Sequence, residues 1–167
     1  MNTPIRPLTD VRRTLDIDLV QSLAGSEIES IDAIGSPVFS GEIDIANARI
    51  RFANGCVANT TASRVSMKTE RKLRIFEDAA YISLDLQQKI LTLIRKRDGG
   101  PQPGQLPVTI EEANLEQGDA LKSEIESFLD CIRNNKRPIV SGEDGLRALE
   151  TAIRITEQVH ANLARSA

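Results

Sequence analysis

Between residues 27 and 114 polar and apolar side chains alternate with the period of two that is typical of β-strands. The clearest run places three apolar side chains on one face: Ala48, Ile50 and Phe52. Asn54-Gly55 follows this run at once, and that dipeptide between two strand-like runs is a strong β-hairpin signal. The pattern therefore predicts a hairpin whose second strand extends from Cys56 to about Val65.

Further strand-like runs follow along the chain at residues 72–77, 81–86, 89–96 and 106–113. The connections at residues 78–80 and 87–88 are too short for a parallel crossover, which needs a dozen or more residues. The runs therefore predict a largely antiparallel open sheet of about six strands.

The first part of the chain has a different pattern. Residues 1–14 show no clear period and predict a tail or linker remnant, followed by a single domain over residues 15–167. Ile17, Val20 and Leu23 recur at helical spacing, so a short helix is expected from Asp16, its candidate N-cap, to Leu23, with Gly25 ending it.

Two longer helices are predicted at the end of the chain. Asp119 can cap the first, whose apolar stripe comprises Leu121, Ile125, Phe128, Leu129 and Ile132. The second begins at Ser141, with Asp144 as an acidic variant of the capping box, and its predicted stripe comprises Leu146, Leu149, Ile153, Thr156, His160 and Leu163. Together with the strands this predicts an α+β fold with helices packed on one face of the sheet.

The other face of such a sheet is either polar or covered by another chain. In the predicted strand 89–96, Ile90 and Ile94 lie on one face while Leu91 and Leu93 lie on the other. A strand that is apolar on both faces favours a homo-oligomer that associates through the sheet face.

Composition limits the classes of partner and compartment. The 21 Lys and Arg against 24 Asp and Glu give a net charge of −3, which argues against nucleic acid as a partner. No membrane span or signal peptide is recognisable, and Cys56 and Cys131 are expected to be buried free thiols in a reducing compartment. We therefore expect a cytoplasmic protein without a membrane contact.

Motifs for independent chemistry are missing. The sequence contains no G-x-G-x-x-G or P-loop motif for a nucleotide, and no Cys/His spacing for a metal. Its only histidine, His160, lies on a predicted apolar stripe and is interpreted as a packing residue rather than a general base. We therefore predict no catalytic, cofactor-binding or metal-binding residue in this chain.

One basic stretch remains, formed by Arg64, Lys68, Arg71, Lys72 and Arg74. Cations of this kind protect exposed sheet edges from pairing with other chains. They can also form an anion site for a phosphorylated or nucleotide-linked sugar. The residues alone leave both interpretations open.

Several segments together resemble a known family. They are residues 16–20, 44–50, 54–64, 72–76, 80–85, 124–129 and 140–150, and they include Asp16-Ile17-Asp18 and Asn59-Thr60-Thr61-Ala62-Ser63-Arg64. In order and spacing they resemble the C-terminal domain of the Gfo/Idh/MocA family of NAD(P)-dependent sugar and polyol oxidoreductases, and most closely its members that act on nucleotide-linked amino sugars.

This resemblance implies a domain that contributes substrate contacts and oligomer interfaces beside a separate Rossmann domain for NAD(P). The family's catalytic His and Asp would match Leu15 and Val11 here, so neither residue is carried over. By resemblance or by charge, the substrate-binding candidates are Asp16, Asp18, Arg64, Lys68 and Arg71.

Two functions follow as hypotheses. In the first, the chain is the substrate-binding and oligomerisation domain of a sugar or nucleotide-sugar oxidoreductase, truncated or split from its cofactor domain and inactive alone. In the second, it is a non-catalytic oligomerising module.

Overall fold

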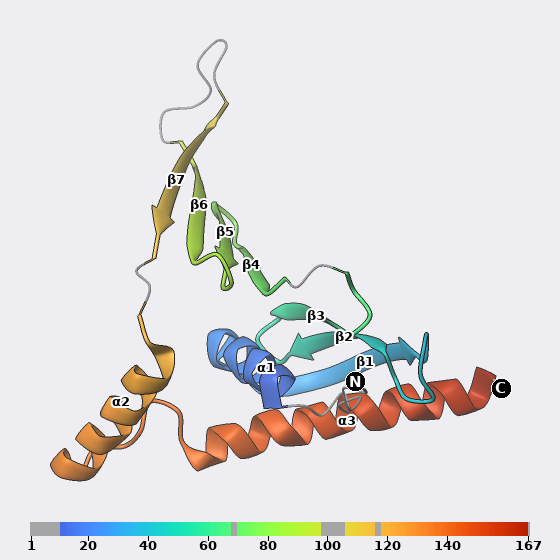
Figure 1. Ribbon diagram of the computed structural model, residues 1–167. Helices are drawn as coiled ribbons and strands as arrows, with labels where there is room; N and C mark the ends of the chain where they lie inside the picture. Colours follow the sequence, from blue (N-terminus) through green and yellow to red (C-terminus); the bar gives the residue numbers. More distant parts are fainter. Residues whose placement is uncertain (1–10, 68–69, 98–105, 116–117, 167) are drawn as a thin grey trace. The chain divides into compact units, whose positions relative to one another are not determined.

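The computed structural model describes residues 11–67, 70–97, 106–115 and 118–166 (Figure 1). Its contacts divide the chain into two compact units, one formed by residues 1–66 with 135–167 and the other by residues 67–134. The first unit contains α1 (Val11–Ala24), β1 (Ile28–Ser36), β2 (Ile45–Phe52), β3 (Val57–Ser63) and α3 (Gly142–Ser166). The second contains β4 (Lys72–Phe76), β5 (Ala80–Asp85), β6 (Ile90–Lys96), β7 (Val108–Asn114) and α2 (Ala120–Asn134).

The described strands form two sheets, in the orders β1-β2-β3 and β4-β5-β6-β7, and every described pair is antiparallel. The predicted α+β class and antiparallel arrangement are therefore confirmed. The strands number seven in two sheets, however, where the sequence predicted about six in one. The additional strand is β1, whose alternation is broken by a bulge between Ile28 and Ser30.

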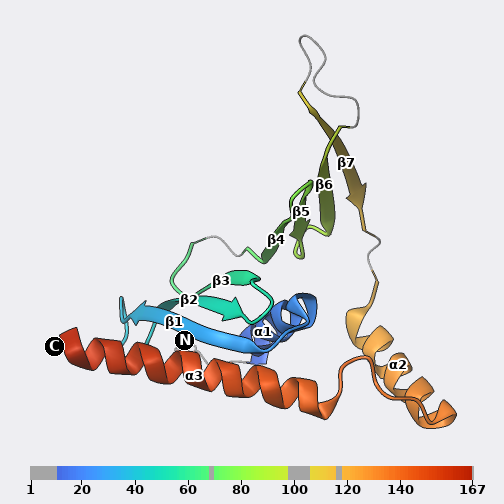
Figure 2. The ribbon, with the colours of Figure 1, turned by 180° about the vertical axis from the view of Figure 1, so that it is seen from behind.

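Helices cover one face of the three-stranded sheet. Helix α3 lies along β1, and α1 contacts both α3 and β3 (Figures 1 and 2). Along β2 every second side chain is buried, while Asn47, Arg49 and Arg51 are exposed on the opposite face. The period of two predicted for this strand is therefore confirmed, and it directs the apolar face toward the helices.

The core of this unit combines small and large apolar side chains mostly from α1, β1, β2 and α3, and among the described residues five of its eleven buried apolar members are alanines. Its buried apolar members are Ile17, Ala33, Ile43, Ala46, Ala48, Ile50, Phe52, Ala148, Ala152, Ile155 and Val159. Gly35 of β1 faces α3 so closely that an added Cβ would lie 2.7 Å from Cγ1 of Val159. Helix and strand backbones can approach this closely only where side chains are small.

The predicted apolar stripe of α3 was partly wrong. Leu163 packs against the core and Thr156 is half-buried, but Leu146, Leu149, Ile153 and His160 are exposed, and the buried face carries Ala148, Thr151, Ala152, Ile155 and Val159 instead. The prediction assigned the largest apolar side chains to the core, whereas Ala148, Thr151 and Ala152 form much of the buried face. The predicted start of the helix is confirmed, because Ser141 and Asp144 form the reciprocal backbone contacts of a capping box.

Helix α1 ends as expected but begins earlier. Gly25 adopts a φ of 58°, and its N–H donates to the carbonyl of Gln21 at 3.0 Å, which closes the helix. The helix starts at Val11, so Asp16 lies inside it and is not its cap. Of the expected tail, residues 1–10 lie outside the described residues and residues 11–14 belong to α1.

The four-stranded sheet places apolar residues on both faces. Its cross-strand partners on one face include Leu73 with Leu84, Ile75 with Ile82, Ile82 with Leu93, and Leu84 with Leu91. On the other face the rings of Phe76 and Tyr81 lie with their centroids 5.0 Å apart. All residues of β5 are half-buried, so neither face is fully covered in the described structure.

Helix α2 is amphipathic as predicted. The Asp119 carboxylate accepts a hydrogen bond from the N–H of Lys122 at 3.0 Å and caps the helix as expected. All five residues of its predicted apolar stripe are exposed: Leu121, Ile125, Phe128, Leu129 and Ile132. The stripe exists, but within the described residues it is not part of a core.

Two smaller expectations can be compared with the structure. Among the described residues, no helix combines the length and apolar composition that crossing a bilayer requires. Cys56 and Cys131 form no disulfide, as predicted, but neither is fully buried: Cys131 is half-buried, and Cys56 is exposed because it directly follows the Asn54-Gly55 turn, where Gly55 has a φ of 87°.

Candidate functional site

The best-defined polar cluster surrounds Asp44, which immediately precedes β2 and is 2% exposed. Its Oδ2 accepts hydrogen bonds from three consecutive backbone N–H groups, those of Val38, Phe39 and Ser40, at 2.7–3.0 Å. Its Oδ1 accepts a hydrogen bond from the Ser40 hydroxyl at 2.8 Å. One carboxylate therefore holds the whole connection between β1 and β2 in a single conformation.

Arg64 completes this cluster from the end of β3. Its Nε donates to Asp44 Oδ1 at 2.5 Å, and one terminal nitrogen donates to the Ser40 hydroxyl at 2.7 Å. The backbone N–H of Arg64 also donates to the carbonyl of Asp44 at 3.0 Å. The pairing of Ile45 with Ser63 brings these two residues together although they are 20 positions apart.

The electrostatics of the cluster keep Asp44 ionised. Burial alone would raise the pKa of its carboxyl, but the N–H groups of Phe39 and Val38, the Ser40 hydroxyl and the Arg64 guanidinium hold that pKa well below its usual value. The buried negative charge is therefore fully compensated by donors, as buried charges must be.

The first consequence of this geometry is mechanical. The loop that Asp44 and Arg64 fix presents the Phe39 side chain with 84% of its surface exposed. The second consequence is that Arg64 is limited as a substrate contact, because two of its nitrogens already donate hydrogen bonds to Asp44 and Ser40. Asp44 and Ser40 were missed by the sequence analysis; the available signal was a Ser-Gly turn four residues before an Asp that opens a strand.

The other predicted site residues are distributed over both units. Asp16 and Asp18 lie on α1, half-buried on either side of the buried Ile17. Arg71 precedes β4 and belongs to the second unit, where its carbonyl accepts a hydrogen bond from the N–H of Leu86 at 2.9 Å. Lys68 lies outside the described residues. The first unit thus contains Asp16, Asp18 and Arg64, while Arg71 belongs to the other.

The described residues do not fit a nicotinamide dinucleotide. That cofactor is held where a strand turns through a glycine-rich loop into a helix, within a parallel βαβ unit. All strand pairs in the described part of the chain are antiparallel, so these residues form no parallel βαβ unit that could hold the cofactor. The same residues include no group of three or more His, Cys, Asp or Glu that could hold a metal ion.

Comparison with known proteins identifies the fold. The family model of the Gfo/Idh/MocA oxidoreductases, C-terminal alpha/beta domain, matches residues 14–162. UDP-N-acetylglucosamine 3-dehydrogenase of Acidithiobacillus ferrooxidans is 35% identical over 150 residues, which cover 90% of this chain and 48% of that protein. Myo-inositol 2-dehydrogenase of Thermotoga maritima is 24% identical over 141 residues, covering 80% and 41%.

Solved structures agree with this assignment. A structure of the Acidithiobacillus ferrooxidans UDP-N-acetylglucosamine 3-dehydrogenase superposes with a TM-score of 0.82 and 34% identity, over 89% of this chain and 47% of the other. An aldose-aldose oxidoreductase from Caulobacter crescentus shares the fold with a TM-score of 0.71 and 19% identity, over 90% and 44%. The chain spans about half the length of the relatives it matches.

The match over most of the chain and the antiparallel α+β architecture lead to one conclusion. This protein belongs to the Gfo/Idh/MocA oxidoreductase family and comprises its C-terminal α/β domain.

Proposed function

We propose that this chain is the substrate-binding and oligomerisation domain of a sugar oxidoreductase whose NAD(P) is held by a separate nucleotide-binding domain. The observation that carries the proposal is the 35% identity to a UDP-N-acetylglucosamine 3-dehydrogenase over 90% of this chain. The substrate class we infer from it is a nucleotide-linked amino sugar. Cys56 and Cys131 form no disulfide, which suits the reducing cytoplasm, where we place the protein.

The proposed substrate contacts divide by charge. The carboxylates of Asp16 and Asp18 can accept hydrogen bonds from sugar hydroxyls, and the cations of Lys68 and Arg71 can bind the diphosphate. Arg64 acts mainly by holding the loop at residues 38–43, because Asp44 and Ser40 already occupy two of its nitrogens. On this proposal the chain supplies binding and orientation, and alone it transfers no hydride.

Titration of UDP-N-acetylglucosamine into the purified chain tests substrate binding. We expect a dissociation constant of about 1 mM or lower, weakened about tenfold by Asp18→Asn and by Arg71→Gln, since each removes one charge-assisted contact. Asp78→Asn, in the exposed turn before β5, serves as the matched control and should bind as the wild type does. If Asp18→Asn and Arg71→Gln bind the nucleotide sugar as tightly as Asp78→Asn does, Asp18 and Arg71 are not part of the site.

The proposed oligomer forms through the four-stranded sheet. One face of this sheet aligns the apolar side chains of Leu73, Ile82, Leu84, Leu91 and Leu93 across three strands. Apolar surface buried against a second copy contributes roughly 25 cal/mol per Å², which favours covering such a face.

Light scattering tests the oligomer. The wild type should show at least twice the 18.3 kDa mass of one chain. The double variant Ile82→Arg with Leu93→Arg places two charges on the proposed interface face and should dissociate it. Thr92→Arg is the matched control, because Thr92 lies on the opposite face of β6, and it should leave the mass unchanged. A wild-type mass of one chain at high concentration would contradict this part of the proposal.

The second candidate is a non-catalytic oligomerising module. It is favoured by the engagement of Arg64 with Asp44 and by Leu15 and Val11 at the positions of the family's catalytic His and Asp. An oligomer that shows no affinity for UDP-N-acetylglucosamine would support this function instead.

A further inference from the structure

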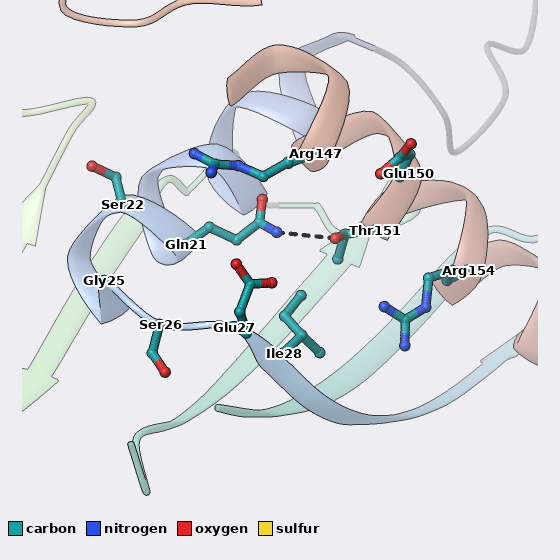
Figure 3. Close-up of a pocket in the computed structure, with 10 residues that line it drawn as sticks. All are labelled: Gln21, Ser22, Gly25, Ser26, Glu27, Ile28, Arg147, Glu150, Thr151 and Arg154. Atoms are coloured by element: carbon teal, nitrogen blue, oxygen red, sulfur yellow. Dashed lines mark hydrogen bonds between the residues drawn. The ribbon is translucent and has the colours of Figure 1, made fainter. Parts of the chain in front are cut away.

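A hollow of about 550 Å³ lies in the first unit between the end of α1 and the first half of α3 (Figure 3). Its walls come from the last turn of α1, the turn at Gly25 to Glu27, the start of β1, and one face of α3 from Arg147 to Arg154. Its volume lies within the roughly 300–1,000 Å³ typical of small-molecule sites. The hollow contains none of the residues proposed above for the sugar substrate.

Hydrogen bonds hold these walls in place. The Gln21 amide donates to the hydroxyl of the buried Thr151 at 3.0 Å and joins α1 to α3. Asn54 lies in the β2–β3 hairpin and fixes the turn at residues 25–27. Its side-chain amide donates to the carbonyl of Ala24 at 2.8 Å, and its N–H donates to Ser26 Oγ at 3.2 Å. The hollow is therefore formed by a rigid frame rather than by a loose loop, which lowers the entropy cost of binding.

The side chains around the hollow carry both signs of charge. Figure 3 shows Gln21, Glu27 and Arg154 gathered around the same space, with Arg147 and Glu150 on the bordering helix. Arg147 is already ion-paired with Asp144, so the charges of the lining that remain are those of Glu27, Glu150 and Arg154. Within the described part of the chain, Glu27 and Arg154 form no salt bridge, either with each other or with another residue. The unpaired carboxylate of Glu27 and the unpaired guanidinium of Arg154 thus ask for groups of opposite charge, and one molecule can supply both.

We propose that this hollow binds a small zwitterion, a molecule of amino-acid size with one anionic group and one ammonium group. The anionic group pairs with Arg154, and the ammonium group pairs with Glu27. A net anion would meet the carboxylates of Glu27 and Glu150, and a net cation would leave Arg154 without a partner, so neither satisfies both halves of the lining. An uncharged polyol would desolvate all these charges without replacing their partners.

Titration of the full chain with glycine, L-serine and L-glutamine, followed by NMR, tests this proposal. Acetate, ethylammonium and glycerol serve as single-charge and uncharged probes. At least one amino acid should bind with a dissociation constant below about 10 mM, at least tenfold tighter than acetate, ethylammonium or glycerol.

Variants then locate the binding. Arg154→Gln and Glu27→Gln should each weaken the amino acid about tenfold or more, because each removes one charge-assisted contact. The matched controls are Arg133→Gln and Glu157→Gln, both at exposed positions outside the hollow, and they should bind as the wild type does. Equal thermal unfolding of all four variants shows that folding is unchanged.

Two results would overturn the proposal: no amino acid binding below about 10 mM, or binding that Arg154→Gln and Glu27→Gln leave unchanged. Neither result bears on the sugar site, because the UDP-N-acetylglucosamine titration uses residues outside this hollow.

Discussion

Substituting Gly35 by alanine tests the packing that defines the first unit. Gly35 lies on β1 where the strand meets α3, and its backbone does not adopt a positive φ, so the substitution changes space rather than backbone freedom. A Cβ at this position would lie 2.7 Å from Val159 Cγ1, 2.8 Å from the carbonyl oxygen of Ile45 and 3.1 Å from Ile43 Cγ2. Carbon atoms normally pack at about 3.5–4.0 Å, so one contact is too short by about 0.8 Å or more.

The loss of unfolding free energy caused by Gly35→Ala depends on which neighbours of the added Cβ can move. Val159 can change its rotamer, but the Ile45 carbonyl is held in the β-ladder between β1 and β2. Overpacking of this kind costs about 1–3 kcal/mol, from which a gain of about 0.4–1 kcal/mol is subtracted because alanine restricts the unfolded chain. The central values leave a net cost of about 1.3 kcal/mol, so with a urea slope of about 2 kcal/mol per molar we expect the unfolding midpoint to fall by about 0.65 M.

Urea unfolding followed by circular dichroism measures this change. Gly41→Ala is the matched control, because no atom lies within 4 Å of its added Cβ, and it should be neutral or slightly stabilising. Combining Gly35→Ala with Val159→Ala should cost less than the sum of the two single changes, since the shortest contact is removed. Equal midpoints for Gly35→Ala and Gly41→Ala would refute the close packing of β1 on α3.

Three further changes test other parts of the structure. Phe52→Ala removes a side chain that is 1% exposed and should lower the free energy of unfolding by about 3–5 kcal/mol in the same urea assay; a loss below about 1 kcal/mol would contradict its place in the core. Gly25→Ala forces a Cβ onto a residue with a φ of 58° and should cost about 1 kcal/mol, so an unchanged or raised midpoint would exclude this helix ending. Because the pKa of Asp44 is lowered in the folded state, its stabilising contribution is present above its usual value of 3.8 and is lost as the pH falls further. The stability difference between the wild type and Asp44→Asn should therefore stay constant from pH 7 to about 5 and shrink below about 4 in acid titrations, whereas a difference that does not change with pH would rule out an ionised Asp44.

The features that the sequence predicted correctly depend on neighbouring residues. Gly25 ends α1, Asp119 caps α2, and Ser141 with Asp144 opens α3, because each signal acts within about four residues of the chain. The antiparallel pairing was predictable for the same reason, since short connections allow no other arrangement.

The features that the sequence could not predict depend on contacts between distant segments. The buried face of α3 is set by its contacts with α1 and β1, which lie more than a hundred residues earlier and include Gly35 against Val159, and not by the largest apolar side chains of the helix. The pairing of Arg64 with Asp44 requires the register of β2 and β3, which brings Ile45 opposite Ser63. The sequence analysis singled out Arg64 by its charge and by resemblance, but the Ser-Gly turn before Asp44 does not reveal that Arg64 is the partner of Asp44.

The most direct measurement of the central claim is a set of parallel calorimetric titrations of the purified chain with UDP-N-acetylglucosamine, NAD⁺ and NADP⁺. Our account predicts saturable heat for the nucleotide sugar and none for either dinucleotide, because in the proposed function this domain binds the substrate and a separate domain binds the cofactor. Micromolar affinity for NAD⁺ or NADP⁺, with no heat from the nucleotide sugar, would contradict it.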